Sequence, residues 1–207
     1  MAIKEGASRP MKYNTYLLFG APGSGKGTQG RTLGSIPRFF HCACGDVFRT
    51  LDTRTKVGRA FLEYSSKGHL VPDEITVELW QARIDSAVEA HEFKPDIDVL
   101  VLDGIPRNVG QAKIMDDVID VKKVFHLSCP DRDQLFARLK KRALKDNRLD
   151  DANEEVIQRR LETYETESKP VLDYYRDRVQ MIDATEPPAR VLYNILTTVA
   201  NGEHAAV

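Results

Sequence analysis

Ten residues near the start of the chain have the composition of a phosphate-binding loop. Residues 20–29 are Gly-Ala-Pro-Gly-Ser-Gly-Lys-Gly-Thr-Gln, and they directly follow the apolar run Tyr-Leu-Leu-Phe at 16–19. Glycines let the backbone turn its N–H groups inward, and a helix that begins there directs its positive dipole end at the same point. Lys26 adds a cation that can follow the outer phosphates of a nucleotide. A strand-to-helix turn without a ligand is the alternative.

A carboxylate follows a second apolar run. Asp103 ends the segment Val-Leu-Val-Leu at 99–102. Mg²⁺ in nucleotide sites is held by few carboxylates and keeps several of its waters. Beside a phosphate loop, we expect Asp103 to bind Mg²⁺ directly or through water, the alternative being an aspartate that caps the turn after the strand.

Arginines are the third chemical signal. Transfer of a phosphoryl group between two polyanions needs many cations, because catalysis there is mostly positioning and charge stabilisation. Arg138 and Arg142 lie four residues apart and therefore point the same way on a helix. A single arginine is by default a solvated surface residue, so the prediction depends on the set: Arg49, Arg107, Arg138, Arg142, Arg148 and Arg160.

The elements that must position these residues alternate between strands and helices. This order is typical of an α/β fold in which a parallel sheet is covered by helices on both faces. Ligands of open α/β sheets bind at the carboxyl ends of the strands, where both Gly20 and Asp103 are expected. The strand-like apolar segments are 15–19, 39–42, 99–102, 124–127 and 179–182.

Two connections depart from this alternation. The long one between the second and third strands has helical patterns at 46–51, 55–66 and 72–90 and therefore predicts an inserted helical lobe. The short one is a charged turn around 146–151. We expect both to close over the substrates and exclude water.

Composition limits the class of protein. The 207 residues suit one domain, and 31 acidic against 30 basic residues give a net charge of −1, which predicts no nucleic-acid or membrane partner. No run is long enough to span a bilayer and no secretory signal begins the chain, so we expect a cytoplasmic protein. Three cysteines argue against a disulfide framework, and a metal site at His41, Cys42 and Cys44 lacks a second ligand cluster.

Together the motifs resemble the adenylate kinases and their nucleoside monophosphate kinase relatives, from Tyr16 to about Leu196. The loop is similar to the family's G-x-P-G-x-G-K-G-T-Q, which explains why Gly27 follows Lys26 and the hydroxyl comes only at Thr28. The other matching segments are Gly-Asp-Val-Phe-Arg at 45–49, Gly-His-Leu-Val-Pro-Asp at 68–73, Asp-Gly-Ile-Pro-Arg at 103–107 followed by Gln111, Arg-Leu-Asp-Asp at 148–151 and Arg-Leu-Glu-Thr-Tyr at 160–164.

The resemblance implies a P-loop kinase with a five-stranded parallel sheet. Its core would comprise 13–43, 92–144 and 153–200, with the acceptor-binding lobe at 44–91 and flexible termini at 1–12 and 201–207. The lid would be the short form, 145–152, because few residues separate Arg142 from Arg148. Such a lid has no room for the zinc ligands of longer relatives.

The implied reaction moves the γ-phosphoryl group of MgATP to AMP. ATP would be held by Gly23, Ser24, Gly25, Lys26, Gly27, Thr28, Arg138 and Arg142. The monophosphate would be held by Cys44, Arg49, Val71, Gly104, Arg107, Gln111, Arg148 and Arg160. The residues implied in catalysis are Lys26, Arg107, Arg142, Arg148 and Arg160, with Asp103 on Mg²⁺.

Three departures from the family pattern leave alternatives open. Cys44 replaces a Ser or Thr, which favours UMP or CMP as acceptor, whereas Gln111 favours AMP because an amide offers adenine a donor and an acceptor together. Arg148 and Arg160 are twelve residues apart, one more than the family suggests, so Arg159 is an alternative to Arg160. Ile105 replaces an aromatic residue.

Two other classes of protein remain as rivals. A GTPase-type switch would need a guanine-binding Asn-Lys-x-Asp motif, which the sequence lacks. A non-catalytic binding protein would have to keep the arginines without using them. We expect an enzyme, and a monomer because no apolar repeat indicates an interface.

Overall fold

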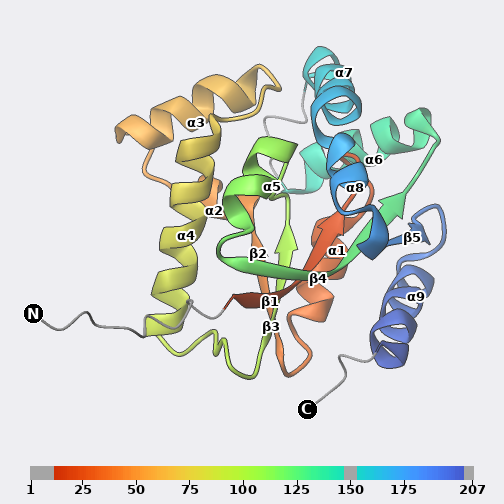
Figure 1. The fold of residues 1–207 in the computed structure, drawn as a ribbon. Helices are drawn as coiled ribbons and strands as arrows, with labels where there is room; N and C mark the ends of the chain where they lie inside the picture. Colours follow the sequence, from red (N-terminus) through yellow and green to blue (C-terminus); the bar gives the residue numbers. More distant parts are fainter. Residues whose placement is uncertain (1–11, 147–152, 203–207) are drawn as a thin grey trace, which may run out of the picture.

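Five parallel strands form the central sheet (Figure 1). The computed structural model describes residues 12–146 and 153–202. The strands are β1 (Tyr13–Phe19), β2 (Phe39–Ala43), β3 (Val99–Asp103), β4 (Ile119–Ser128) and β5 (Val179–Asp183), in the order β2-β3-β1-β4-β5. Every neighbouring pair is parallel. The α/β fold and all five expected strands are thus confirmed.

β4 is longer than its apolar run predicted. It begins at Ile119 rather than at Val124, and in its first half the buried residues Ile119 and Val121 alternate with partly exposed ones. Such alternation is typical of a strand covered on one face only, whereas Val124 and Phe125 are consecutive buried residues. The apolar segment therefore marked only the part of the strand around these two residues and after them.

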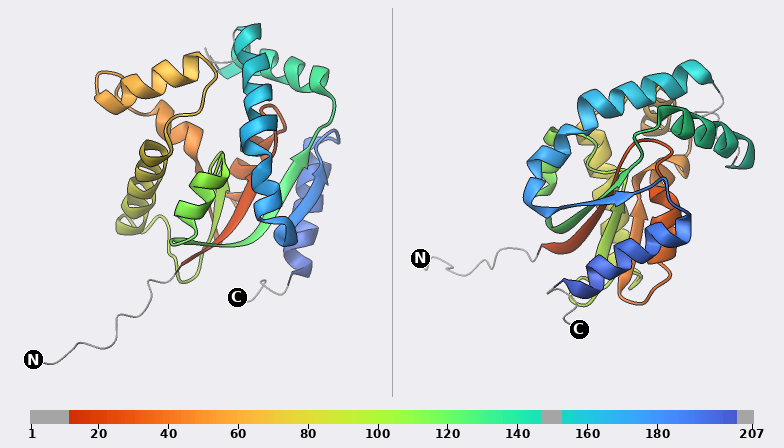
Figure 2. Two further views of the ribbon diagram at one scale, coloured as in Figure 1. Left: turned by 45° about the horizontal axis from the view of Figure 1, so that its top comes forward. Right: turned by 90° about the vertical axis from the view of Figure 1, so that its right-hand side faces the viewer.

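Helices cover both faces of the sheet. α1 (Lys26–Leu33) packs against α9 (Pro188–Asn201) on one face, and α5 (Val109–Met115) packs against α8 (Pro170–Tyr174) on the other (Figure 2, right). α6 (Arg132–Asp146) and α7 (Glu154–Thr163) extend beyond the ends of the strands. A π-helical turn (Tyr164–Ser168) continues α7, and a 3₁₀ turn (Arg176–Arg178) precedes β5.

The long connection between β2 and β3 is a helical lobe, as predicted. It contains α2 (Cys44–Arg49), α3 (Lys56–Ser66) and α4 (Asp73–Glu89). Trp80, Ile84 and Ala87 bury one side of α4 completely, while α3 stands away from the sheet (Figure 1). The lobe also contacts α7: Arg159 donates to the Lys67 carbonyl at 3.1 Å, and Thr163 donates to the Gly68 carbonyl at 3.5 Å.

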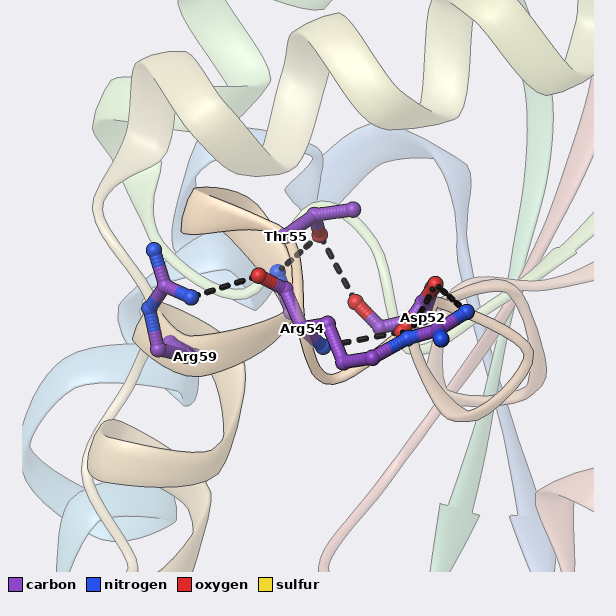
Figure 3. Close-up of polar contacts among 5 residues, drawn as sticks. Asp52, Arg54, Thr55 and Arg59 are labelled. Atoms are coloured by element: carbon purple, nitrogen blue, oxygen red, sulfur yellow. Dashed lines mark hydrogen bonds and ion pairs between the residues drawn. The ribbon is translucent and has the colours of Figure 1, made fainter.

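A tight polar turn begins α3 (Figure 3). The Thr55 hydroxyl donates to the Asp52 carbonyl at 2.8 Å and accepts from the Gly58 N–H at 3.0 Å. The Arg54 guanidinium pairs with both oxygens of the Asp52 carboxylate, and Arg59 donates to the Arg54 carbonyl. The turn brings the Asp52 carbonyl so close that a Cβ on Gly58 would lie 2.3 Å from it.

The three cysteines are buried and free, as expected from the poor disulfide geometry of Cys42 and Cys44. Within residues 12–146 and 153–202, no helix is both long and apolar enough to cross a bilayer. Because the cysteines are free, backbone geometry and packing, rather than a disulfide, hold the functional residues in place.

Gly58→Ala should destabilise the protein although alanine favours helices. The added methyl group would collide with backbone that cannot move away cheaply, and overpacking of this kind costs about 1–3 kcal/mol. We expect the free energy of unfolding in urea to fall by that amount. Thr53→Ala, an exposed change in the same turn, is the control. A Gly58→Ala protein as stable as the parent would contradict this account.

Candidate active site

A cavity of about 600 Å³ opens at the carboxyl ends of β1 and β3. It is lined by the glycine-rich loop, all three segments of the helical lobe, and residues of α6, α7 and the C-terminal region. The strands end here in register, since Leu18 pairs with Asp103. This is the edge of the sheet where the sequence predicted the ligand.

The glycine-rich loop needs its glycines for conformation and for space. Gly20, Gly23 and Gly25 have φ angles of 144°, 85° and 100°, which L side chains rarely adopt. A Cβ at Gly20 would also lie 2.6 Å from the Leu127 carbonyl oxygen. The loop therefore curls tightly before α1, and the first turn of that helix lines the cavity. Backbone N–H groups at such a helix start form an anion site.

Lys26 extends back along this loop. Its ammonium donates to the Gly20 carbonyl at 2.7 Å and to the Ala21 carbonyl at 3.0 Å. Burial lowers the pKa of Lys26 to about 8; the Asp103 carboxylate opposes the shift, and the positive charges of Arg142, Arg107 and Arg160 add to it. The cations therefore act on one point, and an anion bound there would relieve their mutual repulsion.

Several arginines are oriented by their own contacts. Arg107 donates through Nε to the Gly104 carbonyl at 2.9 Å, and Arg138 donates to the Ala184 carbonyl at 2.9 Å. Arg49 pairs with Asp46 at 2.6 Å. Backbone carbonyls fix the direction of Arg107 and Arg138 without neutralising their charge.

Most of the predicted residues lie together. Arg148 falls outside the described residues. Of the two alternatives on α7, Arg160 lines the cavity, while Arg159 contacts Lys67 of the lobe. The predicted residues that line the cavity are Gly23, Ser24, Gly25, Lys26, Gly27, Thr28, Arg49, Val71, Asp103, Gly104, Arg107, Gln111, Arg138, Arg142 and Arg160.

Cys44 is the predicted residue whose place differs. Its side chain is 1% exposed and belongs to the core, whereas its neighbours Ala43 and Gly45 line the cavity. Burial raises the pKa of Cys44 to about 11, so the thiol is neutral. The position packs the start of α2 rather than presenting a polar group to the cavity.

Asp103 lies where a hydrated cation could meet bound phosphates. Its carboxylate is close to the start of α1, because a Cβ at Gly27 would be 3.4 Å from Oδ2. Within residues 12–146 and 153–202, no three or more His, Cys, Asp or Glu residues form a metal-binding group. A lone carboxylate fits Mg²⁺, which keeps its waters and is brought by the nucleotide, better than it fits a dedicated metal centre.

Sequence reasoning missed one wall of the cavity. Glu186, Pro188 and Val191 come from the segment after β5 and the start of α9, and the buried Gln29 of α1 donates to the Pro188 carbonyl at 3.0 Å. Tyr164 and Ser168 of the π-helical turn also line the cavity. The first group had a signal: Asp183 ends a strand at the same sheet edge, and Pro187-Pro188 begins a helix.

The family model described as adenylate kinase matches residues 18–180. The chain belongs to the adenylate kinase family. It is 35% identical over 187 residues to the adenylate kinase of Cyanothece sp., covering 86% of this chain and 91% of that protein. The adenylate kinase of Mycolicibacterium paratuberculosis is 36% identical over 176 residues, covering 81% and 89% of the two chains.

A third relative is similar over a comparable share of the chain. The adenylate kinase of Thermobifida fusca is 34% identical over 191 residues, covering 88% of this chain and 96% of that protein. Membership in the adenylate kinase family confirms the predicted P-loop kinase fold and makes the protein a phosphotransferase.

ATP affinity should fall as the pH rises past 8. Lys26 is protonated below its pKa of about 8 and neutral above it, so its attraction for phosphate is lost on the alkaline side. We expect the dissociation constant for ATP to rise about tenfold between pH 7 and pH 9, as measured by calorimetry at constant ionic strength. Lys26→Arg, whose guanidinium stays charged, should flatten the profile. Equal slopes in both proteins would contradict this assignment.

Proposed function

We propose that this protein transfers the γ-phosphoryl group of MgATP to AMP, reversibly giving two molecules of ADP. The observation that carries the proposal is the convergence of the Lys26 loop, Arg107 and Gln111 on one cavity, in a chain of the adenylate kinase family. The Lys26 loop would suit the triphosphate of ATP, whereas Arg107 and Gln111 would suit the phosphate and the base of a nucleoside monophosphate. The relatives of this protein share the name adenylate kinase, which agrees with ATP and AMP as the two substrates.

The donor side is the glycine-rich loop. Its N–H groups and the Lys26 ammonium would cradle the phosphates of ATP, and Arg138 and Arg142 of α6, which line the same cavity, would also contact ATP. Mg²⁺ held near Asp103 would neutralise charge on the bound phosphates. These groups hold the γ-phosphoryl group in place and stabilise the charge that spreads over its oxygens during transfer.

The acceptor side lies between α2, α4 and α5. Arg49 and Arg107 would hold the phosphate of AMP, and Gln111 would address its base, with the backbone at Val71 and Gly104 beside it. The attacking phosphate oxygen needs no strong general base, because the second pKa of a phosphate monoester is about 6. The attacking oxygen would approach in line with the bond that breaks, and Arg160 would contact the phosphoryl group as it is transferred.

UMP or CMP as acceptor was suggested by Cys44. Cys44 is not among the residues that line the cavity, whereas Gln111 is. An amide pairs with adenine through a donor and an acceptor. AMP is therefore the acceptor that the geometry supports best.

The test is an acceptor panel. Purified protein is given MgATP with AMP, dAMP, CMP, UMP or GMP in turn, and nucleoside diphosphate formation is followed. AMP should give the highest kcat/KM, and omission of Mg²⁺ should abolish turnover. Failure of every acceptor would overturn the proposed function, and preference for a pyrimidine monophosphate would overturn the assignment of Gln111.

Arg107→Ala should remove most of the turnover. Loss of one charged contact that stabilises transferring charge typically lowers kcat about 10²–10³-fold. Arg132→Ala is the matched control, since Arg132 is exposed at the start of α6. Turnover close to the parent value in folded Arg107→Ala would show that Arg107 does not hold the acceptor phosphate during transfer.

Closure of the helical lobe 44–91 is also part of the proposal. The cavity is lined from both the lobe and the core, so water could reach the phosphoryl group unless these parts approach each other. A two-substrate analogue should lower the radius of gyration in solution scattering more than ATP alone does. An unchanged radius would contradict closure. The expected lid, 145–152, lies almost entirely outside the described residues.

A further inference from the structure

Two hydrogen bonds hold the amide of the buried Gln111, and a third joins Asn108 to one of the same partners. Its Oε1 accepts from the backbone N–H of Arg107 at 2.7 Å. Its Nε2 donates to Oδ1 of Asp73, the first residue of α4, at 2.8 Å. The Asn108 amide donates to the same Asp73 oxygen, also at 2.8 Å. Asp73 thus joins the helical lobe to α5 through Gln111 and Asn108.

These partners allow the amide only one orientation. A backbone N–H can only donate, and a carboxylate can only accept. Rotating the amide by half a turn would place its NH₂ against the Arg107 N–H and its oxygen against the Asp73 carboxylate. Both contacts would then be repulsive, so Gln111 keeps its oxygen toward Arg107 and its nitrogen toward Asp73.

The orientation matters because purines differ in the same respect. Adenine has a donor at N6 and an acceptor at N1, whereas a 6-oxopurine has an acceptor at O6 and a donor at N1. These two contacts leave one N–H and one acceptor site of the amide unused, and Gln111 is among the residues that line the cavity. A flipped amide would offer the same pair in reverse and would match the 6-oxopurine.

We propose that Asp73 is a positioning residue that makes the acceptor site selective for 6-aminopurine over 6-oxopurine monophosphates by fixing the amide of Gln111. This inference rests on the proposed function. Asp73 acts on the base only through Gln111, and it does so from the lobe.

The surrounding backbone makes room for this carboxylate. A Cβ on Gly110 would lie 2.9 Å from the second oxygen of Asp73 and 3.1 Å from Oδ1 of Asn108. That Asn108 oxygen in turn accepts from the Gln111 N–H at 2.8 Å and caps α5. Gly110 therefore leaves the space in which Asp73, Asn108 and Gln111 meet.

The experiment compares AMP with inosine monophosphate as acceptors at saturating MgATP. Asp73→Ala removes the acceptor of the Gln111 N–H, and the ratio of kcat/KM for AMP to that for inosine monophosphate should fall about tenfold or more. Asp73→Asn keeps an oxygen at this place and should retain most of the ratio. Glu74→Gln removes a charge from the same helical turn at an exposed residue and should leave the ratio unchanged.

If the role of Asp73 were merely structural, kcat/KM would fall equally for both acceptors and their ratio would not change. That result in a folded Asp73→Ala protein would overturn the inference. If Asp73→Ala does not fold, Gly110→Ala displaces the carboxylate without removing it and should also lower the ratio; an unchanged ratio there would overturn the inference equally. A parent protein that does not phosphorylate AMP would instead refute the proposed function, so the two failures are distinguishable.

Discussion

Repulsion among cations that are clustered at one end of the sheet constrains how this protein is built. Lys26, Arg107, Arg142 and Arg160 lie in the same region, and burial, with the charges of the three arginines added to it, lowers the pKa of Lys26 to about 8. Pairing each cation with a carboxylate would remove the repulsion, but it would also neutralise the positive charge that attracts phosphate. The fold instead directs Lys26 and Arg107 with backbone carbonyls, which are neutral partners. The attraction for phosphate is thereby preserved.

This solution makes demands on the rest of the chain. Free carbonyls near the cavity require backbone that is not in a helix or sheet, and the left-handed glycines at 20, 23 and 25 supply it at the end of β1. The parallel sheet brings β3 beside β1 so that Asp103 is the nearby counter-charge. The glycine-rich loop therefore belongs to the part of the chain that forms the sheet. The proposed acceptor site is shared with the lobe, through the contact of Asp73 with Gln111.

Local patterns explain how much of this was predictable. Short, mainly apolar segments identified every strand, and glycines next to Lys26 identified the loop, because those features depend on neighbours in the sequence. The alternating half of β4 was missed because only one of its faces is buried. The place of Cys44 in the core and the link between Asp73 and Gln111 were also missed. Both features depend on how α2 and α4 pack on the sheet, which cannot be predicted from residues that are neighbours in the sequence.

The contact between α7 and the lobe has a mechanical meaning. Arg159 and Arg160 are neighbours on one helix, but the first binds the lobe backbone at Lys67 while the second lines the cavity. Both side chains also lie against the lobe, because a Cβ on Gly68 would be 3.2 Å from Cγ of Arg160 and 3.5 Å from Cβ of Arg159. Any displacement of the lobe at Lys67 must either break the Arg159 hydrogen bond or carry α7 with it. In the second case, the guanidinium of Arg160 would move together with the lobe.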